Sequence, residues 1–357
     1  MTAQLLRSPL KNRYQLIHFN ISKGRDVSTK ARFDWINVAY GLVQPFQLFW
    51  LMVSYRPAIV YTNLAQNPGG FLRYASFVLV VSFFNTPVVV RVMGDGFNHF
   101  YARASRVLQW LIRLTLKQIT RFIVRAEVLK RQFDTLVPSQ KLRVVYSGIA
   151  IDDFDRPRSR QRNGQVRVLF VGYLTKAKGA LDLLQAVPMV TAVQPQVMFQ
   201  FMGSRIDVER NITYVDNPQS NERALQRLLS QKEVMEHVEL LGVQSGEEKI
   251  KTFVNADIFV LPSYSEAFPT VVLEAIAAGL PVITTAVGAI PEAFSENALL
   301  LVEPGNIPQL TEAILTLVRD PELRQRLVAC GRQMVQEKFN LDAYANRVDG
   351  VFREMIG

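Results

Sequence analysis

The chain has 357 residues, of which 49% are hydrophobic and 20% are charged, and it contains three histidines and a single cysteine. This length and composition exclude a disordered chain and predict a folded protein of two domains. A single cysteine excludes an internal disulfide framework, and the scattered histidines provide no zinc-ligand spacing, so we expect a cytoplasmic protein.

The formal net charge of +10 is concentrated in the first half of the chain. Residues 1–155 contain 20 Lys and Arg but 8 Asp and Glu, whereas the remainder contains 21 and 23. Such a basic half predicts an anionic partner, for which an anionic lipid surface and a nucleic acid are the candidates. No nucleic-acid recognition motif accompanies the charge, so we expect no nucleic-acid partner.

A basic amphipathic helix is expected within Ser105–Leu129, a stretch rich in Leu, Ile and Trp. Its cations Arg106, Arg113 and Lys117 lie near Trp110. The pattern fits an ordinary solvated helix face, and it also fits a helix at the surface of an anionic membrane, where Trp and clustered cations are favoured.

The longest apolar stretch is Phe71–Phe84, which contains Arg73. It falls short of the roughly 20 residues that a membrane-spanning helix needs. It fits a buried helix or a segment that dips into a membrane surface. The N-terminus lacks the pattern of a secretory signal. We therefore expect the protein in the cytoplasm or bound peripherally to the inner face of the plasma membrane.

Short apolar or β-branched runs alternate with longer helical patterns, which is typical of doubly wound α/β sheets. Several runs are almost continuously apolar, as in parallel strands that are covered on both faces. The predicted strands are Tyr14–Phe19, Pro57–Thr62, Pro87–Val92, Ile119–Val124 and Leu142–Tyr146, followed by Gln165–Val171, Gln196–Met202, Ala256–Leu261, Pro281–Thr285 and Ala298–Val302.

A polar, charged segment at Asp152–Gly164 reads as an exposed linker between two halves of similar pattern. The sequence therefore predicts two Rossmann-like doubly wound domains. The first spans residues 1–157 and is completed by a C-terminal helix at 340–357. The second spans residues 158–339.

The most informative stretch is PSYSEAFPTVVLEAIAAGLPVITTAVG, residues 262–288. Pro269 favours a first helical turn and Gly279 a helix end, so we expect a helix over Pro269–Ala278. Its body is apolar except for Glu274, and a carboxylate on a buried helix needs specific partners. An internal pair, a backbone cap and a ligand hydroxyl are the alternatives. The helix start faces the carboxyl ends of the strands, where open sheets bind ligands, and this favours the ligand.

A second acidic residue, Glu266, lies eight positions before Glu274, in the loop that precedes the helix. The N–H groups at Phe268–Thr270 offer an anion site beside both carboxylates. Lys178 precedes Gly179 at a helix start after a predicted strand, and its ammonium group suits a diphosphate. The spacing around it is not that of a Walker loop, so ATP hydrolysis is not indicated.

These residues resemble the signature of retaining GT-B glycosyltransferases of family 4, the glycosyl transferases group 1. The resemblance is carried by the two glutamates in PSYSEAFPTVVLEAIAAGLPVITT, by VGAIPE at Val287–Glu292, by the Lys178–Gly179 pair and by VVYSGIAIDDF. The second half matches almost throughout. The first half resembles the family mainly in layout and in Gly24 of ISKGRD.

The resemblance implies a GT-B fold in which the two domains face a central cleft, with residues 1–157 binding an acceptor and residues 158–339 binding a nucleotide sugar. It implies that Glu266 contacts the transferred sugar and that Glu274 holds the donor ribose. Lys178 would neutralise the diphosphate, and Gly24 would let an N-terminal loop approach it. The residues shaping the rest of the donor site would be Gly172 at the strand exit, Val243 near the nucleobase, and Phe268, Pro269 and Thr270 beside the diphosphate.

The sequence departs from the family at three positions. Tyr173 stands where members often have a phosphate-binding arginine, and Lys176 is the candidate replacement. Ala267 follows the first glutamate where glycine is frequent, and Met93 stands where many members have histidine. In the loop after Met93, the residues Asp95 and His99 are candidates for contacting the acceptor, and a loop without chemistry is the alternative.

The resemblance implies an enzyme without cofactor or metal, whose co-substrate is a nucleotide diphosphate sugar. A DxD-like triplet at 153–155 lies in the linker and not beside a donor pocket, so no metal is expected there. The predicted reaction is retaining transfer of a hexose to a glycan or lipid-linked acceptor, in polysaccharide or glycoconjugate synthesis. A sugar-nucleotide epimerase and a non-catalytic module that binds lipid or nucleic acid are the alternatives.

Overall fold

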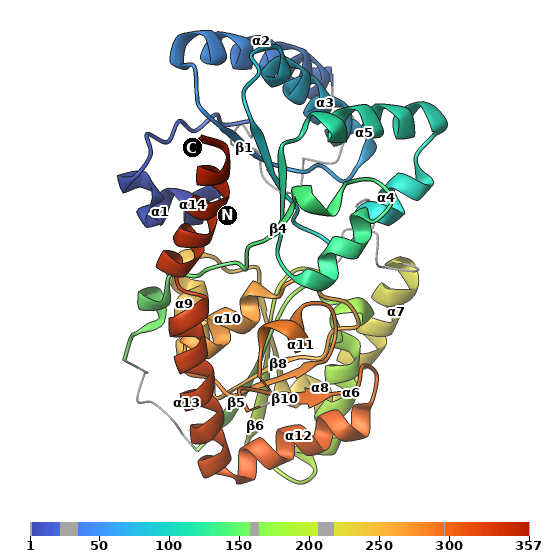
Figure 1. The fold of residues 1–357 in the computed structure, drawn as a ribbon. Helices are drawn as coiled ribbons and strands as arrows, with labels where there is room; N and C mark the ends of the chain where they lie inside the picture. The colour runs from blue at the N-terminus through green and yellow to red at the C-terminus, as the bar shows by residue number, and fades with distance from the viewer. Residues whose placement is uncertain (1, 22–34, 158–163, 206–217, 296, 357) are drawn as a thin grey trace. The chain divides into compact units, whose positions relative to one another are not determined.

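The computed structural model describes residues 2–21, 35–157, 164–205, 218–295 and 297–356 (Figure 1). The chain forms two compact units. Unit 1 comprises Met1–Tyr146 and Tyr344–Gly357, and unit 2 comprises Ser147–Ala343. The segment 158–163, at which the sequence analysis divides the domains, lies outside the described residues.

Unit 1 contains a parallel four-stranded sheet in the order β1-β2-β3-β4. Its strands are β1 (Val60–Asn63), β2 (Val88–Arg91), β3 (Arg121–Val124) and β4 (Leu142–Val144). Its helices are α1 (Thr2–Arg7), α2 (Trp35–Tyr55), α3 (Pro68–Phe83), α4 (Phe97–Arg103), α5 (Arg106–Gln118) and α14 (Leu341–Ile356), with short 3-10 turns η1 (Pro9–Asn12), η3 (Glu127–Phe133) and η4 (Ser139–Lys141). β2 is buried at every position, as the apolar run VVV predicts.

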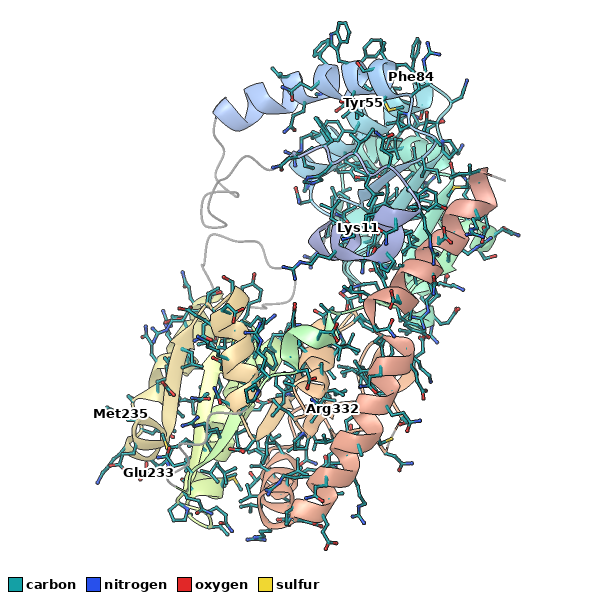
Figure 2. All side chains as sticks on the ribbon, turned by 90° about the vertical axis from the view of Figure 1, so that its left-hand side faces the viewer. Lys11, Tyr55, Phe84, Glu233, Met235 and Arg332 are labelled. Atoms are coloured by element: carbon teal, nitrogen blue, oxygen red, sulfur yellow. The ribbon has the colours of Figure 1, made fainter. Side chains whose placement is uncertain are left out.

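Helices α2, α3 and α5 lie beside one another, with α3 in contact with both of the others (Figure 1). The ring of Phe49 in α2 lies 5.3 Å from that of Phe84, just after α3, and Figure 2 labels Phe84 close to Tyr55 at the end of α2. The apolar stretch Phe71–Phe84 thus falls on a helix. Its buried residues alternate with exposed Leu79 and Phe83, so the helix is only partly covered.

The predicted strand Tyr14–Phe19 is wrong, because the segment joins no sheet. Its first residue instead faces α14: the Tyr14 hydroxyl donates to Asp349, 2.7 Å away, and its ring packs edge-on against Phe352. Most of the following side chains are exposed. This short apolar run therefore begins with a residue that packs against helix α14, and it does not pair with a strand.

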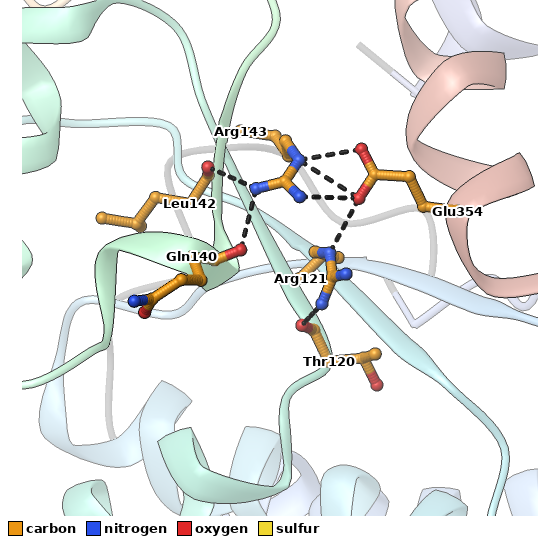
Figure 3. A network of polar contacts seen from close by, with 6 residues as sticks. All are labelled: Thr120, Arg121, Gln140, Leu142, Arg143 and Glu354. Carbon is orange, nitrogen blue, oxygen red and sulfur yellow. Dashed lines mark hydrogen bonds and ion pairs between the residues drawn. The ribbon is translucent and has the colours of Figure 1, made fainter.

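The last helix is tied to the sheet of unit 1 by apolar and by charged contacts. Val348 and Phe352 of α14 share a buried cluster with Val89 of β2. Nearby on the neighbouring strands, the Glu354 carboxylate accepts hydrogen bonds from Arg121 of β3 and from Arg143 of β4, and the Arg143 contact is bidentate (Figure 3). These hydrogen bonds, that of Arg143 foremost, hold the pKa of Glu354 below its usual value.

Unit 2 contains a parallel six-stranded sheet in the order β10-β9-β8-β5-β6-β7. Its strands are β5 (Val166–Val171), β6 (Val197–Met202), β7 (Val238–Gly242), β8 (Ile258–Leu261), β9 (Val282–Thr285) and β10 (Leu300–Val302). Its helices are α6 (Ala180–Thr191), α7 (Pro218–Leu229), α8 (Lys232–His237), α9 (Gly246–Asn255), α10 (Thr270–Ala277), α11 (Ile290–Ala293), α12 (Ile307–Arg319) and α13 (Pro321–Lys338), with 3-10 turns η5 (Ile151–Phe154) and η6 (Lys176–Lys178).

The strand order of unit 2 reverses between β5 and β8. The chain runs outward from β5 through β6 to β7, then returns to place β8 on the other side of β5. Such a reversal opens a crevice at the carboxyl ends of the strands, which is where doubly wound sheets bind ligands. The edge strand β7 was missed in the sequence, because Val238–Gly242 is half exposed and carries little apolar pattern.

Nine of the ten predicted strands match a strand of the structure, with ends displaced by up to a few residues. The described residues include no helix that is both long enough and apolar enough to cross a membrane.

We predict that Glu354→Gln lowers the free energy of unfolding by about 1 kcal/mol at pH 7, because the ion pairs are partly exposed. Since the folded-state pKa is depressed, the stabilisation is complete above the unfolded carboxyl pKa of about 4.3 and is lost as the pH falls through the lower folded value. Urea unfolding at pH 7 and pH 3 measures this difference. Asp134→Asn, an exposed acid of the same unit, is the control. An equal effect at both pH values would contradict the prediction.

Candidate functional site

A cavity of about 400 Å³ opens at the carboxyl ends of the strands of unit 2, where the strand order reverses. It is lined by residues 171–173 after β5, 202–204 after β6, 243–244 after β7, Glu266 and 268–271 after β8, together with Lys178 and Lys249. Four strands thus contribute to one site, although their loops are far apart in the sequence.

The first acidic residue of the site, Glu266, is paired with a lysine across the strand reversal. Lys178 follows β5, and its Nζ donates to Glu266 Oε1 at 2.7 Å. Ser263 Oγ donates to the same oxygen at 2.8 Å. The Glu266 side chain is only 9% exposed, so both partners offset the cost of burying its charge.

Two glycines bring the loops of this pair together. Gly179 has φ 73°, and a Cβ there would collide with the Pro262 backbone at the end of β8. Gly288 has φ 56°, and a Cβ there would collide with the carbonyl oxygen of Glu266. Only glycine takes these positive φ values without strain and leaves the space. The glycines of the KG and VGAIPE motifs therefore let the loops after β5 and β9 pack closely against the backbone that follows β8.

The predicted helix Pro269–Ala278 is present as α10, with Pro269 and Ala278 as its flanking caps and Gly279 at φ 76° just beyond. The residues around Glu274 on this helix are buried and apolar. The Glu274 side chain is 17% exposed, and this burial raises the pKa of its carboxyl above the usual value, against the opposing effect of a nearby lysine.

That lysine is Lys249 of α9. Its Nζ lies 2.7 Å from each Glu274 oxygen, and the hydrogen bond goes to Oε1. Oε2 has an ionic contact without a hydrogen bond of its own. Of the three alternatives for Glu274, the structure therefore shows an internal pair. Lys249 lines the same cavity as Glu266, and Glu274 lies behind it.

Six further residues of the predicted site line this cavity: Gly172, Tyr173, Val243, Phe268, Pro269 and Thr270. Gly172 leaves the β5 strand beside the ring of Phe170, and Val243 is largely exposed at the end of β7. Lys176 is not among the residues that line the cavity. Its ammonium lies 5.9 Å from the ring of Tyr264, in a cluster with buried Asp182, whose pKa burial raises.

The remaining predicted residues belong elsewhere. Gly24 lies outside the described residues. Asp95 and His99 belong to unit 1, where Asp95 is half-buried after β2 and His99 is exposed in the first turn of α4. The Arg125 guanidinium donates to the carbonyl oxygen of Met93 and so holds the start of that loop. In the part of the chain that the structure describes, no three His, Cys, Asp or Glu side chains gather into a metal site.

Sequence reasoning missed Lys249 and Ser263. Ser263 stands directly after β8, and its proximity to Glu266 could have been read from the turn between them. Lys249 was hidden because β7 was missed. Once Val238–Gly242 is recognised as a strand, the helix that follows must start near the same sheet edge, and a lysine in its first turn becomes a candidate.

The family model for glycosyl transferases group 1 matches residues 152–334. Spore coat protein SA of Bacillus subtilis is 27% identical over 260 residues, which is 68% of this chain and 67% of that protein. The capsular polysaccharide biosynthesis glycosyltransferase CapM of Staphylococcus aureus is 25% identical over 275 residues, 73% of this chain and 67% of that protein. The chain thus spans about two thirds of the length of these curated relatives.

Solved structures share the fold. HepE of Anabaena in complex with UDP has a TM-score of 0.71 at 16% identity, covering 87% of this chain and 82% of that one. Sucrose-phosphate synthase from Thermosynechococcus elongatus has a TM-score of 0.69 at 20% identity, covering 89% and 78%. The chain accordingly has the GT-B fold with two Rossmann-like domains. Because the family model covers more than half of its residues, the chain belongs to the glycosyl transferases group 1 family.

Proposed function

We propose that the chain is a retaining, metal-independent glycosyltransferase that moves a hexose from a nucleotide diphosphate sugar to a glycan or lipid-linked acceptor. One observation carries this proposal: two mostly buried glutamates are each paired with a lysine, and Glu266, Lys178 and Lys249 of these pairs line one cavity at the strand reversal of unit 2. Family membership and the HepE structures with UDP and with UDP-glucose support a nucleotide-sugar donor.

The donor is proposed to bind with its diphosphate between Lys178 and the start of α10. Lys178 supplies a cation, and the N-terminal end of the α10 dipole supplies partial positive charge near Thr270. Glu266 is proposed to accept hydroxyl hydrogen bonds from the transferred sugar, and Glu274 those from the ribose. Val243 is proposed to pack near the nucleobase. Each role follows the family resemblance onto a residue whose side chain is at or beside the cavity.

The reaction breaks the bond between the anomeric carbon and the diphosphate oxygen and forms a bond from that carbon to the acceptor oxygen on the same face of the sugar. The electron pair of the broken bond leaves with the diphosphate, on which negative charge grows. Fixed donors aimed at such developing charge are often the largest single contribution to catalysis. The acceptor proton is proposed to pass to the leaving phosphate oxygen, so the reaction needs no strong base from the protein.

The acceptor side is proposed to work at an anionic membrane surface through unit 1. Helices α2, α3 and α5 contain no Asp or Glu. Trp50 on α2 is 70% exposed, Phe83 on α3 is 75% exposed and Trp110 on α5 is 62% exposed. Exposed aromatic side chains and the α5 cations, on adjoining helices without acidic residues, suit the headgroup boundary of anionic lipids. This arrangement favours a lipid-linked acceptor over a soluble glycan.

We predict that Lys178→Ala and Glu274→Ala each lower the transfer rate by about 100–1000-fold, because each removes a charged partner of the donor. Transfer from UDP-, GDP- and ADP-sugars is measured with product analysis. Lys251→Ala, an exposed lysine of α9 that does not line the cavity, is the matched control. Unchanged activity in both cavity variants would refute the site. Conversion of the sugar nucleotide without an acceptor would favour an epimerase instead.

We predict that neutralising Arg106, Arg113 and Lys117 to glutamine weakens sedimentation with phosphatidylglycerol vesicles by on the order of 100-fold, since each cation near an anionic surface contributes about 1 kcal/mol. Neutralising three exposed cations of unit 2, Lys232, Arg319 and Arg326, is the charge-matched control and should leave binding nearly unchanged. Failure of the unaltered chain to sediment with these vesicles at low salt would end the membrane proposal.

A further inference from the structure

The Lys249–Glu274 pair is a feature of the donor cavity that the family signature did not predict. Lys249 comes from the first turn of α9, and Glu274 comes from the second turn of α10. The lysine side chain is 26% exposed and belongs to the cavity wall, whereas Glu274 lies behind it. Any ligand group that reaches Glu274 therefore meets the Lys249 ammonium as well.

The ammonium of Lys249 is fixed from two sides. Its Nζ lies 2.7 Å from both oxygens of Glu274 and 5.7 Å above the ring of Phe253, one helical turn further along α9. An ammonium group has three N–H donors, and the geometry uses one of them in a hydrogen bond to Oε1. Oε2 lies at the same distance from Nζ, is buried and makes no hydrogen bond in this arrangement.

From this geometry we infer that Lys249 is a positioning residue of the donor site, which keeps the Glu274 carboxylate ionised and oriented for a ribose hydroxyl that enters from the cavity and which thereby selects a ribonucleotide over a deoxyribonucleotide. The inference rests on the proposed function, because it assigns the ligand of the same cavity more finely. It differs from the family resemblance, which assigns Glu274 to the ribose and gives no role to position 249.

The role of the cation follows from the surroundings of Glu274. Burial raises the pKa of this carboxyl, and Lys249 is the charged side chain that opposes the shift. The charged residues of the other elements packed on α10 are Asp152 and Asp153 of η5 and, from the side of α13 nearest the helix end, Arg332, which donates to the carbonyl oxygen of Ala277. Strands β8 and β9 carry no charge. Without Lys249, the effect of burial on the pKa of Glu274 would be unopposed.

The consequence is a pH-dependent loss of ribose binding. Removing the ammonium takes away the charge that lowers this pKa, so Glu274 is protonated at a higher pH in a variant without the cation than in the unaltered chain. A protonated carboxyl is a weaker acceptor than a carboxylate, because hydrogen bonds to charged groups are about twice as strong as neutral ones. In the unaltered chain the ion pair with Lys249 opposes protonation, so ribose binding depends less on pH than in the variant.

The test is the affinity of the full chain for UDP, GDP and ADP and for their 2′-deoxy counterparts, by calorimetry at pH 8 and pH 6. The ratio of ribo to deoxy affinity reports the ribose contact, because the diphosphate titrates alike in both nucleotides. We predict a ratio of at least about 10 for the unaltered chain, as for a hydrogen bond to a charged group. In Lys249→Met the ratio falls to within about 3-fold of unity at pH 6 and recovers partly at pH 8.

Three further variants make the outcome unambiguous. Lys249→Arg keeps the cation and should restore the ratio at both pH values, which a merely structural lysine would not require. Lys249→Gln replaces the cation with a neutral donor and answers the same question should the methionine variant fail to fold. Lys251→Met, on the exposed face of the same helix, should leave the ratio unchanged.

Two results would overturn the inference, and they are distinguishable. If the unaltered chain binds a ribonucleotide but Lys249→Met keeps the full ribo-to-deoxy ratio at pH 6, or binds more tightly, Lys249 is a bystander or a plug and the proposed function survives. If the unaltered chain binds none of the three diphosphates, the proposed function fails and this inference fails with it.

Discussion

The donor cavity of unit 2 depends on the pairing of two mostly buried carboxylates with two lysines. A carboxylate removed from water must be compensated by a partner of opposite charge and by hydrogen bonds, or it becomes protonated. Here the compensation comes across the fold, because Glu266 follows β8 while its lysine follows β5, and Glu274 lies on α10 while its lysine lies on α9. The Lys178–Glu266 pair joins the loops after β5 and β8, the two strands between which the order reverses, so the topology of the sheet brings these two charges together.

The same constraint explains the glycines that surround the site. A pair at 2.7 Å requires the loops after neighbouring strands to approach until backbone nearly touches backbone, and a side chain at Gly179 or Gly288 would prevent this. Both residues have positive φ, so replacing either one with another amino acid would strain the backbone. The residues of the sequence motif therefore lie together where these loops pack against one another. The motif consists of the two glutamates, the KG pair and the VGAIPE segment, and its charged residues and glycines are needed together.

The sequence predicted this junction because its signals are local and chemically unusual. A lone acid on an otherwise apolar helix and a proline and glycine at the helix ends located α10 to within a residue at each end.

The sequence-based prediction failed where contacts between distant segments determine the local structure. The Tyr14 hydroxyl donates a hydrogen bond to Asp349, more than 300 residues away in the sequence, and its segment forms no strand. Lys249 could not be found without β7, an edge strand whose half-exposed residues give little hydrophobic pattern. Lys176 was the candidate replacement for the arginine expected at Tyr173, and in the structure its ammonium lies near the ring of Tyr264 while Lys178, in the same 3-10 turn, pairs with Glu266.

The two units differ in how their cationic side chains are paired with acidic ones. In unit 2 the cations of the cavity are matched by acids, so the cavity can exchange one anionic partner, a carboxylate, for another, a diphosphate, without leaving a buried charge alone. In unit 1 the layer of α2, α3 and α5 has cations and exposed aromatic side chains but no acid. Unmatched cations are stable only in water or against an anionic surface, and exposed Trp and Phe favour the surface. This layer carries Arg73, Arg106, Arg113 and Lys117, and lipid headgroups are proposed to be the counterions of these cations.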